Sequence, residues 1–337
     1  MAPTERVTLK QIAAQTGVSM TTISKVLNGA VDVSSATRAR VEAHLRQSGY
    51  RRRNSRRRRE YIEVALYELE KEWALAIIEG VREVAAEAGL AVSLSVSGDR
   101  HTPGDEWVES VLRRRPCGII LLFAGIPRVG REKLRSRGIP FVIIDPAGDP
   151  TPGIPAVGSA NWSGGVDATR HLIELGHRRI AAIAGPRDIM SSVARLDGYR
   201  SALTTARLPV DPHLIRFGEF DRESGERDAH ALLSLPDPPT AVFAGSDIQA
   251  LGVLHAAAAR GVTVPEDLSV VGFDDLAVAE LANPRLTTIR QPLHEMAEQA
   301  TRLLLQLLED SLPEVTRVEL AASLIVRDST APAPPSK

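Results

Sequence analysis

Residues 8–28, TLKQIAAQTGVSMTTISKVLN, constrain the fold most, because they predict two short helices joined by a tight turn. Thr8 is a suitable N-cap for the first helix, and Gly17 stands where a left-handed C-terminal cap is needed. Ser19 can cap a second helix over Met20–Leu27. Two helices joined by a glycine turn are typical of a helix-turn-helix.

One side of the second helix is polar, and its side chains are short. Ile23, Val26 and Leu27 fall on the other side, which predicts the buried face. Hydroxyl and amide groups can bond phosphates and base edges, and Lys25 can donate to guanine. We therefore expect DNA contacts from Thr8, Ser19, Met20, Thr21, Thr22, Ser24, Lys25 and Asn28. A helical hairpin docked on a larger domain is the alternative interpretation.

The charge distribution decides between these interpretations. Residues 1–59 hold 13 lysines and arginines against 3 acidic residues, and the remainder holds 28 against 39. A basic head on an acidic body is the electrostatic footprint of duplex binding. Residues 51–59, RRRNSRRRR, predict a disordered linker that clamps phosphates or enters the minor groove on DNA. The linker contacts that we expect are Arg51, Arg52, Arg53 and Arg56.

From residue 61 onward, apolar runs alternate with amphipathic helices. The predicted strands are 61–67, 90–96, 117–123, 141–145, 180–185, 214–220, 241–245 and 268–273. Continuous apolar strands between helices predict α/β architecture with parallel sheets covered on both faces. The pattern restarts after the Pro/Gly-rich residues 146–155, which predicts two doubly wound subdomains. Such an arrangement binds ligands between its halves, at the carboxyl ends of the strands.

Residues 8–28 also resemble the headpiece of the lactose/galactose repressor (LacI/GalR) family, T-x-x-x-I-A-x-x-A-G-V-S-x-x-T-V-S-x-V-L-N. Thr16 replaces an alanine of that pattern, and Ile23 replaces a valine. The similarity continues in the second half of the chain, at residues 161–183, 195–203, 264–275 and 284–291. The linker departs from the family, because it has no leucine to wedge into the minor groove.

The resemblance implies a three-helix headpiece in residues 1–50, a linker in 51–60 and a type I periplasmic-binding-protein-like core in 61–330. Three crossings between subdomains are then expected. The N-subdomain would combine residues 61–159 and 291–319, and the C-subdomain 160–290 and 320–330. Residues 331–337 are rich in proline, and we expect a disordered tail there.

The loops after the predicted strands carry residues suited to a sugar, since aromatic faces stack on sugar rings and Asp, Asn and Arg bond hydroxyls. By resemblance, Arg195, Asp247 and Asp274 match positions that usually hold the effector. The expected effector site comprises Trp73, Asn161, Trp162, Arg195, Ser246, Asp247 and Asp274. Structural interpretations remain open for each: a tryptophan can pack at a helix start, Asp274 can cap a turn, and Arg195 can pair with Asp197 or Glu174 on the surface.

The expected function is a sugar-responsive DNA-binding repressor that acts as a homodimer on operator DNA. No motif of the common enzyme classes appears, so we expect no catalytic residue, cofactor or metal. The single cysteine, Cys117, excludes a disulfide framework or a cysteine zinc cluster. No signal peptide or membrane-length apolar run appears, which favours a cytoplasmic, nucleoid-associated protein. Alternatives are a purine- or nucleoside-responsive or activating member of the family, and a sugar-binding protein without a regulatory role.

Overall fold

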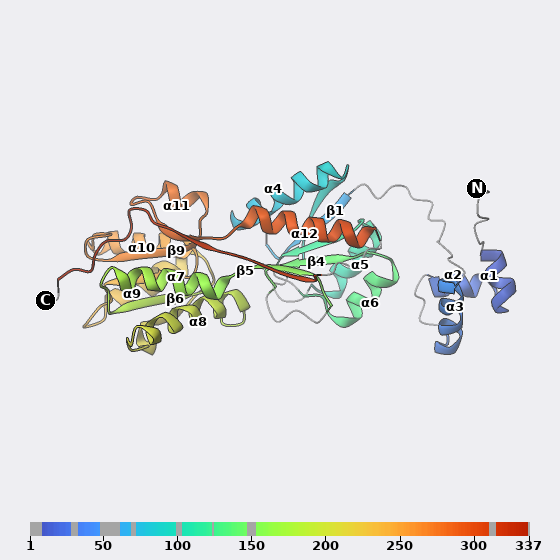
Figure 1. Cartoon of the computed structure of the whole chain (residues 1–337), viewed down its shortest axis with the longest axis horizontal. Coiled ribbons are helices and arrows are strands. Elements are labelled where there is room, and N and C mark those ends of the chain that lie inside the picture. The colour runs from blue at the N-terminus through green and yellow to red at the C-terminus, as the bar shows by residue number, and fades with distance from the viewer. Residues whose placement is uncertain are drawn as a thin grey trace.

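The chain folds into a helical headpiece followed by an α/β core with two sheets (Figure 1). The computed structural model describes residues 9–27, 33–47, 61–68, 72–98, 103–122, 125–146, 153–309 and 315–335. Thr8, Asn28 and the linker arginines Arg51, Arg52, Arg53 and Arg56 lie outside the described residues. None of the described helices combines the length and apolar character needed to cross a bilayer.

The headpiece is built from α1 Leu9–Thr16, α2 Met20–Leu27 and α3 Ser35–Gln47. Gly17 ends α1 with a left-handed φ of 65°, as the sequence predicts. Ser19 caps α2, because its Oγ accepts a hydrogen bond from the Thr22 N–H at 3.1 Å, and Ser34 caps α3 in the same way. The three helices share a small apolar centre made of Ile12, Val18, Ile23, Val26 and Val41. The predicted helix-turn-helix is confirmed.

The first lobe of the core, the N-lobe, is a six-stranded parallel sheet in the order β11-β5-β4-β3-β1-β2. Its strands are β1 Tyr61–Leu66, β2 Ala91–Val96, β3 Ile119–Leu122, β4 Phe141–Ile144, β5 Ala156–Ser159 and β11 Arg317–Leu320. Its helices are α4 Glu72–Glu87, α5 Asp105–Arg114, α6 Arg128–Ser136 and α12 Leu293–Leu308. Helices α4 and α12 pack on one face, and α5 and α6 on the other. Both faces are therefore covered, which explains the continuous apolar strands.

The second lobe, the C-lobe, has the sheet order β12-β10-β9-β8-β6-β7, in which β12 alone pairs antiparallel. Its strands are β6 Ile180–Ala184, β7 Ile215–Phe217, β8 Ala241–Ala244, β9 Ser269–Asp274, β10 Thr287–Arg290 and β12 Ser323–Ile325. Its helices are α7 Asn161–Glu174, α8 Met190–Thr205, α9 Arg222–Leu233, α10 Asp247–Ala259 and α11 Ala277–Leu281. Helices α7 and α8 cover one face of this sheet, and α9 and α10 cover the other. The expected fold class is confirmed.

Three segments join the lobes, and they run from β5 to α7, from β10 to α12 and from β11 to β12. The strands of both lobes direct their carboxyl ends toward the space between them, since residues after β4 and β9 line the same pocket. The lobes also share apolar contacts there. Leu276 of the C-lobe is buried in the N-lobe core beside Leu293 and Met296. This junction positions the site described below.

The structure differs from the sequence-based expectations at several element ends. The predicted strand 214–220 is shorter, because Pro212–Leu214 form a 3-10 turn and Phe220 leaves the strand with a φ of 59°. Strands β5, β10, β11 and helix α11 are too short to stand out in the sequence. The expected disordered tail is held on the C-lobe at its start. The Ala331 carbonyl accepts from His177 Nε2 at 3.1 Å, and the Ala333 N–H donates to the Leu175 carbonyl at 2.8 Å.

Candidate functional site

A cleft between the lobes, with about 620 Å³ of space open to solvent, is lined by polar and aromatic side chains from both sides. The N-lobe and its connection supply Tyr67, Glu72, Trp73, Asp145, Gln291, Leu293 and Met296. The C-lobe supplies Ser191, Arg195, Phe220, Ser246, Ile248, Asp274 and Leu276. A ligand in this cleft would contact both lobes at once.

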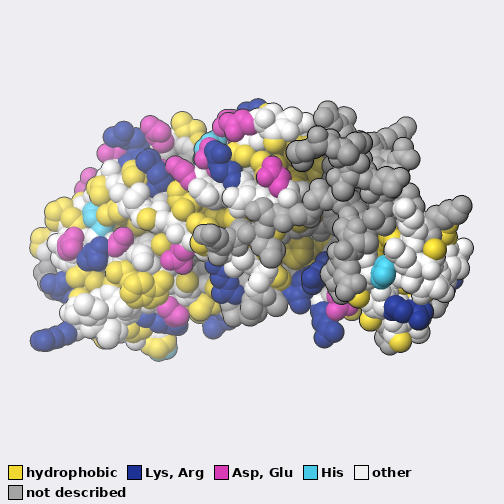
Figure 2. Space-filling model, turned by 45° about the vertical axis from the view of Figure 1, so that its right-hand side comes forward, with side chains coloured by type: hydrophobic (Ala, Val, Ile, Leu, Met, Phe, Trp, Pro, Cys, Tyr) yellow, Lys and Arg dark blue, Asp and Glu magenta, His cyan; other side chains and the backbone are white. Residues whose placement is uncertain are grey.

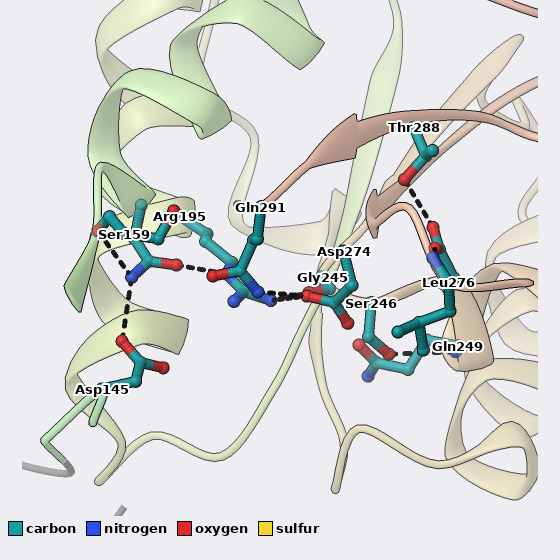
Figure 3. A network of polar contacts seen from close by, with 12 residues as sticks. Asp145, Ser159, Arg195, Gly245, Ser246, Gln249, Asp274, Leu276, Thr288 and Gln291 are labelled. Carbon is teal, nitrogen blue, oxygen red and sulfur yellow. Dashed lines mark hydrogen bonds and ion pairs between the residues drawn. The ribbon is translucent and has the colours of Figure 1, made fainter. Parts of the chain in front are cut away.

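Arg195 is the centre of the polar network in the cleft (Figure 3). Its side chain is 5% exposed although arginine is seldom buried. Its Nε donates to Asn161 Oδ1 at 2.8 Å, and its Nη1 donates to the Gly245 carbonyl at 2.6 Å and to Asp274 Oδ1 at 3.3 Å. The alternative of a surface ion pair is wrong, because Asp197 and Glu174 pair with other arginines.

The network continues from Arg195 toward both lobes. The Asn161 amide donates to Asp145 Oδ1 at 3.2 Å, which links α7 of the C-lobe to the end of β4 in the N-lobe. On the other side, the Gln291 amide donates to Asp274 Oδ1 at 2.6 Å. Gln291 Oε1 is buried and has no hydrogen-bond partner among the described residues. A chain of polar contacts thus spans the cleft, and at its Gln291 end it includes a buried acceptor without a partner in the described chain.

Two glycines fix the backbone that carries Arg195. A Cβ added at Gly165 in α7 would lie 2.1 Å from the Arg195 carbonyl oxygen, and one at Gly198 in α8 would lie 2.2 Å from the Trp162 carbonyl oxygen. Helices α7 and α8 therefore pack backbone against backbone, which larger residues would prevent. This packing sets the depth at which the guanidinium enters the cleft.

Carboxylates outnumber cations in the buried part of the site. Burial raises the pKa of Asp274 to about 6, although Arg195 and the Gln291 amide favour its charged form. Burial also raises the pKa of Asp145, against the attraction of Arg195. One buried guanidinium compensates both acids, because it bonds Asp274 directly and attracts Asp145 through space. A ligand with several hydroxyl donors is complementary to this charge pattern, and an anionic ligand is not.

Aromatic rings complete the cleft walls. Trp73 lies at the start of α4 in the N-lobe, and Phe220 follows β7 in the C-lobe. The Arg195 guanidinium carbon lies 3.8 Å from the centre of the Phe273 ring and 5.5 Å from that of Phe220. The aromatic rings contact the guanidinium from the apolar side, while Asp274, Asn161 and the Gly245 carbonyl accept from its donors. The cleft therefore offers both stacking surfaces and directed hydrogen bonds.

The structure brings Trp73, Arg195, Ser246 and Asp274 of the predicted site together in the cleft, with Asn161 supporting Arg195. Ser246 contributes less than expected, because its hydroxyl accepts from the Gln249 N–H at 3.1 Å and caps α10.

Asp247 and Trp162 of the predicted effector set do not line the cleft. The Asp247 carboxylate is fully buried and accepts from the Thr288 hydroxyl at 2.5 Å and from the Leu276 N–H at 2.8 Å. Burial and the neighbouring Asp274 raise the pKa of Asp247 well above its usual range. Its position makes it a support for the turn that carries Asp274. The Trp162 side chain is 50% exposed and lies outside the cleft lining.

Sequence reasoning missed several cleft residues, chiefly Asp145, Phe220 and Gln291. The same rule that selected Asp274 would have found the first two, because both end a predicted strand. Gln291 ends the family-like segment 284–291, but no spacing rule marks it. The prediction that His177 is structural agrees with its contacts. It is buried and bonds the Thr240 and Ser269 hydroxyls at 2.9 Å and 3.0 Å.

The headpiece presents most of its predicted DNA-contact residues to solvent. Met20 is 53% exposed, Thr21 and Lys25 are exposed, and Thr22 and Ser24 are half-buried. Ser19 is exposed, but its Oγ is engaged by the cap. The outer face of α2 thus carries the short polar side chains and the lysine that a recognition helix needs.

The comparisons with protein families agree with both halves of the structure. Residues 8–53 match the family described as bacterial regulatory proteins, lacI family, and residues 169–330 match the periplasmic binding protein-like domain. The chain is 34% identical over 328 residues to the HTH-type transcriptional repressor CytR of Escherichia coli K12, covering 96% of each chain. It is 36% identical over 337 residues to the HTH-type transcriptional regulator CelR of Thermobifida fusca, covering 96% of this chain and 98% of the relative.

Solved structures share the fold over nearly the whole chain. The CelR–cellobiose complex superposes with a TM-score of 0.73 at 35% identity, covering 96% of this chain and 100% of that one. The lac repressor dimer bound to operator and the anti-inducer ONPF gives a TM-score of 0.71 at 28% identity, covering 97% and 100%. These relatives are regulators and not enzymes, as expected. The chain belongs to the LacI family of bacterial regulatory proteins and is a DNA-binding transcriptional regulator with an effector-binding core.

Proposed function

We propose that the protein is a repressor whose operator binding is controlled by a small uncharged sugar held in the cleft between the lobes. The polar chain from Asp145 through Asn161, Arg195 and Asp274 to Gln291 carries this proposal. Such a chain offers acceptors and donors in pairs, as neighbouring sugar hydroxyls require, and Trp73 and Phe220 offer faces for the ring. The cellobiose complex of the similar CelR structure supports a sugar over other ligand classes.

The proposed switch depends on contacts with both lobes. Asp145 and Trp73 belong to the N-lobe, whereas Arg195 and Asp274 belong to the C-lobe. A ligand that bonds both sets binds one lobe arrangement better than another, and only this difference in affinity can shift the equilibrium. Leu276 moves with the C-lobe but packs in the N-lobe core, so a change in lobe angle would have to repack it.

A twofold dimer is expected from the way in which a helix-turn-helix contacts DNA. A single recognition helix covers one half-site, and a twofold dimer reads a near-palindromic operator. The lac repressor structure, which covers 97% of this chain in superposition, is a dimer on its operator. We therefore propose that lobe rotation changes the spacing of the two headpieces and so couples the effector to DNA.

Two titrations test this function. Calorimetry with a panel of neutral mono- and disaccharides, sugar phosphates and nucleosides should give saturable binding for a neutral saccharide alone. Operator binding in the presence of that saccharide should weaken. Asp145→Asn should reduce saccharide affinity, whereas Asp197→Asn on the surface is the matched control. Binding of a nucleoside or a sugar phosphate instead of a neutral sugar would contradict the proposal.

A further inference from the structure

The strands of the N-lobe sheet all begin at one edge, and the linker joins the core there. β1 begins at Tyr61, and its neighbour β3 follows the end of α5. The Tyr61 hydroxyl donates to the Arg114 carbonyl oxygen at 2.8 Å, so the end of α5 lies beside the start of β1. Helix α6 ends at the same edge, directly before β4. This edge of the core is thus the part that the chain connects to the DNA-binding headpiece.

Three arginines, Arg113, Arg115 and Arg135, are exposed at this edge, and we call them the basic edge. Their guanidinium groups form no hydrogen bond or ion pair with any residue that the structure describes. Other cations nearby are engaged. Arg114 donates to the buried Glu63 at 3.0 Å, and Lys133 donates to Glu109 at 2.6 Å. The basic edge is therefore positive charge that no ion pair neutralises in the described chain, although Arg113 lies close enough to Glu109 to help lower the pKa of that carboxyl.

Helix stability accounts for part of this pattern. Cations near a helix C-terminus interact favourably with the helix dipole, which suits Arg113 in α5 and Arg135 in α6. Arg115 is different, because it occupies the left-handed C-cap with φ 56° and ψ 59°. Glycine or asparagine is usual at such a position, and another residue costs roughly 1–2 kcal/mol there. Helix capping alone therefore does not account for an arginine at position 115.

On the side formed by α5 and α6, Glu109 pairs with Lys133 and also attracts Arg113, and further carboxylates lie on the other face of the sheet. Glu87 ends α4, and Glu309 follows α12, and these two helices cover the face opposite to α5 and α6. On the C-lobe, by contrast, positive and negative side chains are interspersed (Figure 2). The positive charge at the N-lobe edge is therefore concentrated on the side formed by α5 and α6.

We propose that the basic edge binds backbone phosphates of the same duplex that the headpiece reads, so that the core itself contacts DNA. The proposal rests on DNA binding by the headpiece. Residues 48–60 separate α3 from β1, a span of at most about 45 Å for a fully extended chain, so the edge can lie no farther than this from the end of the headpiece. Duplex DNA carries one charge per roughly 1.7 Å, and arginine bonds phosphate through two parallel donors.

A phosphate contact from the core has a regulatory consequence. The linker has no leucine to insert into the minor groove. A hinge anchored by such a leucine therefore cannot transmit the lobe angle to the DNA. An N-lobe that touches DNA directly would lose its phosphate contacts when the lobes rotate. Lobe rotation on effector binding therefore changes operator affinity in two ways, through the phosphate contacts of the basic edge and through the spacing of the headpieces.

The test compares the salt dependence of operator binding in full-length protein. The variant replaces Arg113→Gln, Arg115→Gln and Arg135→Gln together. Each lost phosphate contact lowers the slope of log K against log salt by about 0.9. The slope should therefore fall by roughly 3 if one protomer's basic edge contacts DNA, and by roughly 5 if both do. The corresponding Arg→Lys variant should restore most of the slope.

The matched control is a second triple variant on the C-lobe, Arg200→Gln, Arg207→Gln and Arg260→Gln. These arginines lie along or after α8 and α10, whose first residues are at the cleft. Arg207 has a left-handed φ of 57°, close to the 56° of Arg115. The control removes equal charge, so an equal fall in slope for both triples would overturn the proposal. Unchanged thermal unfolding of both variants excludes misfolding. A wild-type protein without operator preference would instead refute the proposed function.

Discussion

Asp274→Asn should remove a loss of stability that the wild-type protein suffers as the pH rises to neutral, while it weakens effector binding. Asparagine keeps the shape of the side chain and an acceptor oxygen for Arg195 and Gln291, but it cannot ionise. In the wild-type protein Asp274 is a buried carboxylate that shares its cation with Asp145. The free energy of unfolding should therefore include a penalty for ionising Asp274, and the substitution removes that penalty.

The magnitude follows from the pKa of Asp274, which burial raises from 3.8 to about 6. The folded state holds this proton more tightly than the unfolded state, so the unfolded chain binds fewer protons between about pH 4 and pH 6. The free energy of unfolding therefore falls as the pH rises through this window. Two pKa units correspond to about 3 kcal/mol of lost stability. This penalty for ionising Asp274 is absent below about pH 4 and complete above about pH 6. The stability of the variant relative to the wild type should therefore rise by this amount between about pH 4 and pH 6.

Urea unfolding followed by circular dichroism at pH 4.5, 5.5, 6.5 and 7.5 measures the difference directly. Asp197→Asn, which removes a half-exposed carboxylate from the same helix as Arg195, is the control. A stability difference between wild type and Asp274→Asn that stays constant across these pH values would refute the reasoning. Saccharide affinity should fall for Asp274→Asn at every pH, because the proposed site loses a carboxylate that accepts from sugar hydroxyls.

Three further substitutions test other parts of the structure. Arg195→Ala should abolish the effector response and also destabilise the core by roughly 3–5 kcal/mol, because it leaves Asp274 buried without its cation; thermal unfolding and operator binding with and without saccharide measure both effects. Gly165→Ala should lower the melting temperature and effector affinity together, whereas Gly158→Ala, where an added Cβ meets nothing within 4 Å, should not. Lys25→Ala should relax preference at one operator base pair by about 1–3 kcal/mol in competition binding; equal weakening on all sequences would make Lys25 a phosphate contact.

Much of the fold could be predicted because its signals are local. Gly17 and Ser19 mark the turn and the cap of the helix-turn-helix within a few residues, and helical spacing marks its buried face. The alternation of apolar strands and amphipathic helices indicates covered parallel sheets. Short strands such as β5 Ala156–Ser159 and β11 Arg317–Leu320 span too few residues to show a periodic pattern in the sequence. They are recognised only from their pairing with neighbouring strands in the sheet.

The residues of the candidate cleft could be predicted in part. Arg195 and Asp274 were found because one resembles a family position and the other ends a strand, and they meet at 3.3 Å. Asp247 was expected beside them, since it also follows a strand. Its carboxylate instead turns toward Thr288 and Leu276, in space left open by Gly272, where a Cβ would lie 2.3 Å from Asp247 Oδ1. The rule of strand ends gives position along the chain and not the direction of a side chain.

The sequence by itself determined the family, the headpiece and the doubly wound class, because caps, periodicity and charge act between residues close in the chain. The tertiary structure alone decided which polar residues share the cleft. Asp145, Asn161 and Gln291 come from three separate segments, and their bonds to one another and to Arg195 depend on how the lobes meet. It also decided the ionisation of these acids, since burial and one shared guanidinium set their pKa values and neither is visible in sequence spacing.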